Sequence, residues 1–263
     1  EMLARQPAAA HRLRDKKTAA LTTTVLCLYV LVAVGIPLLG LVMPVFGGAD
    51  FGRALGELRR TAVNTFIYGL GAGLTSALLG LLLAFFVGRS NRLRTACIAV
   101  CLTLFCVPPA FQALGIVQIA TAAPAGLDPL LRSRLTVCLA LGIRFVPVAA
   151  ILALRAWGST SPSWALAGAV HGLPLKTYLR RIALPFMLPS AAMATLLVAL
   201  LATADIGTVL LLHPPGETSL PLAVFTVMAN ARESTVASLC LVYVAAAAAL
   251  LAGAFAAAGR RRG

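Results

Sequence analysis

Six long, uninterrupted apolar runs constrain the fold of this chain more than any other feature of its sequence. They lie near residues 19–46, 61–88, 95–120, 133–157, 186–212 and 235–258. About 20 apolar residues are enough for a helix to cross a bilayer, whereas a membrane-spanning β-strand alternates in polarity. With 60% hydrophobic and 11% charged residues, the chain does not match a soluble domain, where about 25% are charged. The sequence therefore predicts an all-α integral membrane protein with six transmembrane helices over residues 19–259.

Proline and glycine shape these predicted spans. Prolines fall in several of them, and membrane helices tolerate such kinks when neighbouring groups satisfy the freed backbone. These prolines include Pro37, Pro44, Pro108, Pro109 and Pro147. The second span carries small residues at intervals of about four, which let helices approach closely in lipid; they include Gly69, Gly73, Ser76 and Gly80. The pattern predicts a tight helix–helix seam, and glycine scattered without such a role is the alternative.

Basic residues outnumber acidic ones by 22 to 8, which gives a net charge of +14. Nucleic acid is not an expected partner, because no basic stripe carries interleaved aromatic residues for base stacking. Instead, 15 Lys and Arg fall on one side of the predicted spans and six on the other. By the positive-inside rule the richer side is cytoplasmic. It includes the basic segment 1–18 and the tail 260–263, so both termini are predicted to be cytoplasmic.

No motif in the chain indicates catalysis or a metal. The six Cys lie in apolar runs without a Cys-x-x-Cys pair, and the three His are scattered along the sequence. Lys176 and Thr177 resemble the end of a nucleotide-binding P-loop, but Leu175 stands where that loop needs glycine. We expect no catalytic residue, metal ligand or cofactor in this chain, and a membrane-embedded enzyme is the disfavoured class.

The longest predicted cytoplasmic loop, residues 158–185, is the most informative segment. Ser163 is a candidate N-cap for a short helix over 163–171, and Gly172 would break that helix. Pro174 would open a second helix that ends at Arg180 and Arg181, before Pro185 enters the fifth span. Two short helices joined at a glycine form a protrusion. An ordinary amphipathic surface loop is the alternative that these residues leave open.

This loop resembles the EAA loop of permease subunits in binding-protein-dependent ABC importers. That family's pattern is Glu-Ala-Ala, three residues, Gly, nine residues, Ile, one residue and Leu-Pro. The second half matches fully here, at Gly172, Ile182, Leu184 and Pro185. In the first half Ala167 matches, Leu166 stands where Glu is usual, and Gly168 replaces the second Ala.

Further stretches agree over roughly residues 60–260. Residues 60–65 resemble the start of the family's core domain, and 205–220 resemble its ferric-iron branch. The resemblance implies a bacterial inner-membrane permease, with a second permease subunit or half and an extracytoplasmic solute-binding protein as partners. It also implies a cytoplasmic ATPase dimer, which would hold ATP–Mg²⁺. By the same resemblance, the residues expected at the ATPase interface are Ala167, Gly168, His171, Gly172 and Lys176.

Two charged residues, Arg144 and Asp205, fall inside predicted spans. Such residues usually face a partner or a water-filled path. At 1.5 Å per residue, Arg144 lies roughly 13 Å and Asp205 roughly 12 Å from the external ends of their spans. The matched depths allow an ion pair, which is either purely structural or lines the substrate path. Other candidates for that path are Gln112, Thr203 and Thr208.

The resemblance names iron(III) as the substrate, while the residues suit an anion better. Iron(III) is a hard cation that prefers oxygen ligands, and the spans offer one carboxylate beside one arginine. A small anionic organic solute such as a phosphonate is the runner-up. A secondary transporter or channel subunit is the rival class, which predicts an inverted repeat and helices broken at matching positions in both halves. No such repeat is evident, and a structural membrane subunit is a further alternative.

Overall fold

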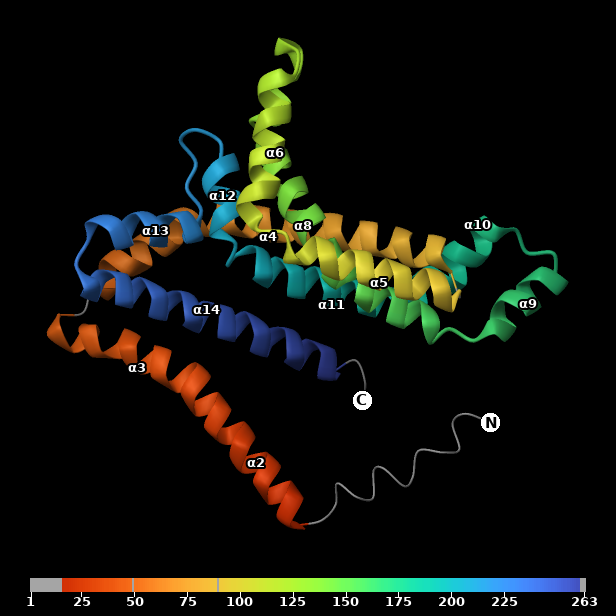
Figure 1. The fold of residues 1–263 in the computed structure, drawn as a ribbon, viewed down its shortest axis with the longest axis horizontal. Coiled ribbons are helices and arrows are strands. Elements are labelled where there is room, and N and C mark those ends of the chain that lie inside the picture. The colour runs from red at the N-terminus through yellow and green to blue at the C-terminus, as the bar shows by residue number, and fades with distance from the viewer. Residues whose placement is uncertain (1–15, 49, 89, 261–263) are drawn as a thin grey trace. The chain divides into compact units, whose positions relative to one another are not determined.

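The computed structural model of this chain describes residues 16–48, 50–88 and 90–260, and over these ranges it contains helices and no strand. The chain divides into two compact units, and Figure 1 shows the helices of both. One combines residues 1–55 with 231–263, and the other comprises 56–230. The predicted basic segment falls mostly at 1–15, outside the described residues, as do Arg89 and the end of the tail at 261–263.

Several helices are long and apolar enough to cross a membrane, so the predicted class of all-α membrane protein is confirmed at that level. Four continuous helical stretches qualify: Ala19–Gly47, Phe51–Val87, Arg134–Gly158 and Leu175–Ala202. The bent pair Asn91–Cys106 and Pro109–Ala122 raises the number to five. The sixth predicted span lies within the last helix of the chain. The apolar stretch Glu233–Ala249 of that helix is shorter than the 18 residues used to identify a membrane-spanning helix.

The first unit contains the N-terminal helices and the C-terminal helix. Helix α2 (Lys16–Val30) continues through the π-helical turn η1 (Leu31–Gly35), α3 (Ile36–Val42) and the 3-10 turn η2 (Met43–Gly47). Helix α14 (Glu233–Arg260) packs against α3 and η2. The large apolar side chains of α2 are exposed, as expected for a helix that faces lipid or another protein.

The second unit is built around a seam of small residues on α4 (Phe51–Val87). A Cβ atom added at Gly69 would lie 3.1 Å from the carbonyl oxygen of Ala199 in α11 (Leu184–Ala202). One added at Gly80 would lie 2.8 Å from the backbone of Ala149 in α8 (Arg134–Gly158). Helix α4 therefore approaches two helices at backbone contact distance, which confirms the seam predicted from its small residues.

The third predicted span is broken at its paired prolines. Helix α5 (Asn91–Cys106) ends before Val107, which is extended at ψ 127°, and α6 (Pro109–Ala122) leaves at 86° to it (Figure 1). The residue before a proline avoids helical angles, so Pro108 ends α5 and Pro109 can open α6. The short turns η3 (Ala125–Leu127) and α7 (Asp128–Leu131) lead to α8, which continues through Pro147 without interruption.

The loop between α8 and α11 is the predicted pair of short helices with a glycine turn. Helix α9 (Pro162–Val170) is followed by Gly172 at φ +65° and then by α10 (Leu175–Tyr178). The predicted N-cap, Ser163, is wrong. Ser161 takes that position, because Pro162 occupies the first helical turn, where its missing amide hydrogen costs nothing.

The predicted end of the second helix at Arg180 and Arg181 is also wrong. The helix continues through the π-helical turn η4 (Leu179–Ala183) into α11. Pro185 has no amide hydrogen, so it cannot donate to the carbonyl of the residue four positions earlier. In the wider π turn before it, the Leu184 N–H donates to the carbonyl of Leu179, five positions earlier. The turn η1 stands in the same relation to Pro37, so both π turns directly precede an X-Pro pair.

The fifth predicted span is broken as well. Helix α11 ends at Ala202, and α12 (Ile206–Leu212) begins after a short non-helical break, followed by α13 (Leu220–Asn230). The core of the unit gathers buried side chains from α4, α6, α8, α11 and α12, including Tyr68, Leu141, Val198 and Val209. Both broken spans therefore contribute side chains to this core, although the first break itself, at Val107 and Pro108, is exposed.

Candidate functional site

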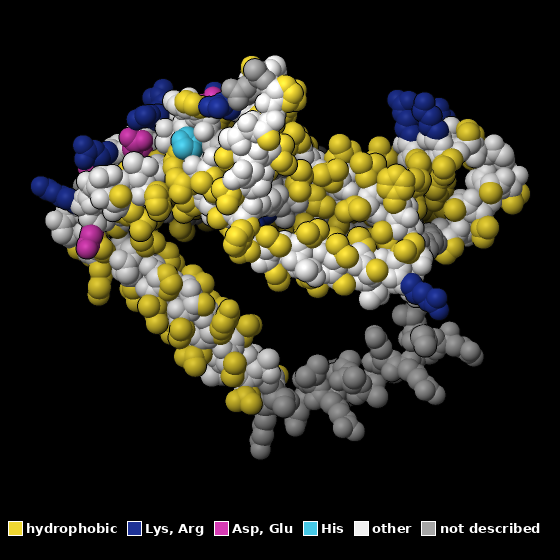
Figure 2. All heavy atoms as spheres, turned by 45° about the horizontal axis from the view of Figure 1, so that its top comes forward, with side chains coloured by type: hydrophobic (Ala, Val, Ile, Leu, Met, Phe, Trp, Pro, Cys, Tyr) yellow, Lys and Arg dark blue, Asp and Glu magenta, His cyan; other side chains and the backbone are white. Residues whose placement is uncertain are grey.

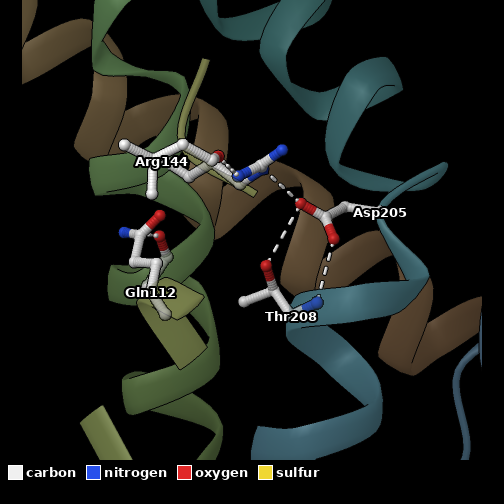
Figure 3. A network of polar contacts seen from close by, with 6 residues as sticks. Gln112, Arg144, Asp205 and Thr208 are labelled. Carbon is white, nitrogen blue, oxygen red and sulfur yellow. Dashed lines mark hydrogen bonds and ion pairs between the residues drawn. The ribbon is translucent and has the colours of Figure 1, made fainter. Parts of the chain in front are cut away.

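A buried ion pair lies where the two helix breaks approach α8. The Nε atom of Arg144 lies 2.7 Å from Oδ2 of Asp205 (Figure 3), and the side chains are 14% and 4% exposed. Nε forms no hydrogen bond of acceptable geometry among the described residues. The contact is therefore an ion pair, defined by the short distance between the two charged groups. Two opposite charges withdrawn together from water or lipid stabilise each other, whereas either one alone would be costly.

Asp205 is held by the start of the helix that it caps. Its Oδ1 accepts a hydrogen bond from the Thr208 backbone N–H at 3.0 Å, and its Oδ2 accepts one from the Thr208 hydroxyl at 3.1 Å (Figure 3). This is ordinary N-capping, which places an aspartate at the position before a helix. Both carboxylate oxygens are therefore already occupied, one by Thr208 alone and the other by Thr208 and Arg144.

Arg144 also contacts the break in the third predicted span. Its Nη1 donates to the carbonyl oxygen of Val107 at 3.1 Å. That carbonyl is available because Val107 is extended rather than helical. Nearby, Gln112 donates from Nε2 to the carbonyl oxygen of Ala140, one turn before Arg144 on α8, at 3.2 Å. One guanidinium therefore joins α8 to both helix breaks.

The structure brings together most of the residues that the sequence placed on a substrate path. The predicted contact between Arg144 and Asp205 is confirmed, and Thr208 and Gln112 belong to the same neighbourhood (Figure 3). Thr203 follows the end of α11, and its hydroxyl donates to the Leu200 carbonyl. That any of these residues meets a substrate stays a prediction.

A second polar cluster was not predicted from the sequence. Tyr68 donates to Glu217 at 2.8 Å, and Arg134 lies 2.5 Å from the other carboxylate oxygen of Glu217. Two more hydrogen bonds, from Asn64 to the Thr218 carbonyl and from the Leu220 N–H to Thr65, join α4 to the same loop. The available signal was the rarity of acidic residues, since only eight occur in the chain. The cluster fixes the loop after α12.

The residues predicted to contact an ATPase fall on the α9–α10 protrusion. Gly172 adopts φ +65° at the turn, His171 caps the end of α9, and Lys176 is exposed on α10. Ala167 is exposed, whereas Gly168 is buried, and a Cβ atom added to it would lie 3.5 Å from the Tyr178 ring. Gly168 therefore supports the turn from inside, and the interface role of the set stays a prediction.

Among the described residues, no three His, Cys, Asp or Glu side chains converge to hold a metal ion. No protein-family model and no curated protein matches the chain. The geometry of the protrusion and of the Arg144–Asp205 pair is therefore what bears on function.

Proposed function

We propose that the chain is the transmembrane permease subunit of a binding-protein-dependent ABC importer of six spans. The observation that carries the proposal is the helix–turn–helix of α9 and α10, inserted between α8 and α11. Gly172 occupies the left-handed turn, a conformation that residues with a side chain rarely adopt. This agrees with the resemblance of residues 158–185 to an EAA-type coupling loop.

The exposed surface of the protrusion supports a protein partner. Leu166 and Val170 are one helical turn apart on α9 and are 67% and 83% exposed, and Leu175 on α10 is 63% exposed. Apolar side chains gathered on such a protrusion mark an interaction surface. In this proposal the partner is a cytoplasmic ATPase, whose closure moves α10, and η4 transmits the movement to α11.

The Arg144–Asp205 neighbourhood supports a solute path in the same unit. Non-helical backbone at membrane depth is tolerated where it is buried in protein or lines a water-filled cavity, and two such breaks meet Arg144 here. An external binding protein would deliver the solute, and a second permease subunit or half would complete the path.

For the substrate, we keep iron(III) from the resemblance to the ferric-iron branch. The pair itself favours the alternative, a small anionic organic solute such as a phosphonate, because both oxygens of Asp205 are engaged. The contacts described above use Nε and Nη1 of Arg144 and leave Nη2 for an anion. A deletion strain that grows normally under iron limitation but cannot use a phosphonate as sole phosphorus source would favour the alternative.

The broken spans also bear on the rival class of secondary transporters, in which discontinuous helices form the binding site. An inverted repeat would place its breaks at equivalent positions of the two halves. Here the breaks fall in the third and fifth predicted spans. If each half holds three spans, the first break lies in the last span of its half and the second break lies in the middle span of the other half. The positions are not equivalent, so the importer remains the proposal.

Reconstitution separates the classes. The chain is placed in liposomes with its co-purified ATPase and the solute-binding protein, and solute uptake is measured with and without ATP. The importer requires ATP, the ATPase and the binding protein together. Uptake driven by an ion gradient through the chain alone would overturn the importer and establish the secondary transporter.

A further inference from the structure

A groove of about 560 Å³ lies between α9 and the start of α11. This falls within the range of about 300–1,000 Å³ that is usual for ligand sites. Its walls are mostly apolar and include Trp164, Leu173, Ile182 and Phe186. The rings of Trp164 and Phe186 pack edge to face with centroids 5.4 Å apart. A charged group, Arg181, also lines this groove.

The surroundings of the groove are basic and have no counter-charge in the neighbouring sequence. Lys176, Arg180 and Arg181 are all exposed, and dark blue side chains gather over α10 in Figure 2. No Asp or Glu occurs anywhere in residues 129–204. Among the described residues, none of the ion pairs involves these three cations. The positive charge of this segment is therefore not neutralised from within and favours an anionic ligand.

The cations and part of the apolar wall follow each other along one continuous helix, formed by η4 and α11. Arg180 and Arg181 lie in η4, and Phe186 lies in the first turn of α11, within the span-capable stretch Leu175–Ala202. Basic residues at the end of a membrane helix extend toward lipid headgroups, and anionic lipids are attracted to such clusters. A ligand that fits must combine an anionic head with an apolar chain.

We propose that this groove binds an anionic phospholipid. Its phosphate group lies at Arg181, and one acyl chain lies along Trp164, Ile182 and Phe186. A free phosphate ion would leave the apolar walls uncovered, and an acidic protein surface would engage the cations without filling the groove. This inference needs the chain to lie in a membrane but does not depend on the proposed importer function. Ala167, Gly168 and His171, which belong to the set expected at the ATPase interface, also line the groove.

Fluorescence of Trp164 tests the proposal directly. The chain has two tryptophans, so Trp157→Phe leaves Trp164 as the single reporter. The full chain in neutral detergent micelles is titrated with brominated phosphatidylglycerol or brominated phosphatidylcholine, whose bromine atoms quench nearby tryptophan. We expect half-quenching at a several-fold lower fraction of the anionic lipid. Arg181→Gln should reduce this preference about five-fold, whereas Arg181→Lys should keep it.

The matched control is Arg92→Gln on α5, which removes an exposed cation that does not line the groove and should leave the preference unchanged. Equal quenching by the two lipids, or a preference that Arg181→Gln does not alter, overturns the proposal. Equal quenching would instead favour an acidic protein surface as the partner of these cations. If the Arg181→Gln protein does not elute as a single species, the dependence of quenching on salt concentration is measured instead. Raising salt from about 0.05 to about 0.5 M should remove the preference and spare quenching by phosphatidylcholine.

Discussion

Gly207 of α12 packs directly against Pro109 of α6, and a Cβ atom on Gly207 would lie 3.0 Å from the proline Cγ. The first turns of two helices that follow separate breaks are therefore in contact. Arg144 binds both breaks, through the Val107 carbonyl on one side and the Asp205 carboxylate on the other. The two irregular segments form one packed polar junction within the second unit.

Removing one member of the ion pair should cost more than removing both. We expect Arg144→Met or Asp205→Leu alone to lower the free energy of unfolding by about 3–5 kcal/mol, because each leaves a buried charge unpaired. The double variant should cost less than either single variant, measured by denaturant titration in detergent micelles. Thr208→Val, which removes one hydrogen bond to Asp205, should cost only about 0.6 kcal/mol. Strictly additive losses would show that the two side chains do not interact.

The small-residue seam should not tolerate even one methyl group at Gly80, where α4 meets the backbone of α8. Gly80→Ala places a Cβ atom 2.8 Å from the backbone of Ala149, so overpacking should lower the free energy of unfolding by about 1–3 kcal/mol. The matched control is Gly115→Ala on α6, where nothing lies within 4 Å of the added atom. That control should be neutral or stabilising by up to about 1 kcal/mol. Equal effects of the two substitutions would rule out the close approach of α4 and α8.

The turn at Gly172 should separate folding from coupling. In the proposed importer, Gly172→Val forces a β-branched residue into φ +65° and should abolish solute-stimulated ATP hydrolysis while solute binding to the external binding protein is unaffected. Gly172→Asn is the control, since asparagine tolerates this backbone region, and it should retain most of the stimulation. If Gly172→Val hydrolyses ATP and transports at parental rates, the protrusion is not the coupling element.

The Glu217 cluster should control the mobility of the loop after α12. Glu217→Gln removes the ion pair with Arg134 and weakens the contact with Tyr68, so amide hydrogen exchange in residues 213–219 should speed up several-fold. Exchange in α8 and α11 should stay unchanged. Glu57→Gln, which alters the exposed pair with Arg60 at 3.8 Å, is the control and should have no effect on this loop. Unaltered exchange in Glu217→Gln would show that the hydrogen bonds of Asn64 and Thr65 hold the loop by themselves.

Local sequence features predicted much of the architecture. Continuous apolar runs predicted helices long enough to span a membrane, the pair Pro108 and Pro109 predicted a disruption, and Gly172 predicted a turn between two short helices. These features act within a few residues, through backbone geometry and hydrogen bonding. The π turns before Pro37 and Pro185 do not follow from the missing amide hydrogen alone, because α8 continues through Pro147 and α11 through Pro189 as α-helix.

Only the tertiary structure decided which distant residues meet. The sequence allowed Arg144 and Asp205 to pair by depth, but the break at Val107 and the capping of α12 by Asp205 depend on how α6, α8 and α12 pack. The Glu217 cluster was likewise not predictable, since Tyr68, Arg134 and Glu217 come from segments far apart in the chain. The groove beneath α9 is lined by residues within 164–186, but it depends on how α9 packs against η4 and α11. Periodicity and composition determine which segments become helices in lipid. The contacts between those helices depend on side-chain shape and on hydrogen-bond partners that exist only after packing.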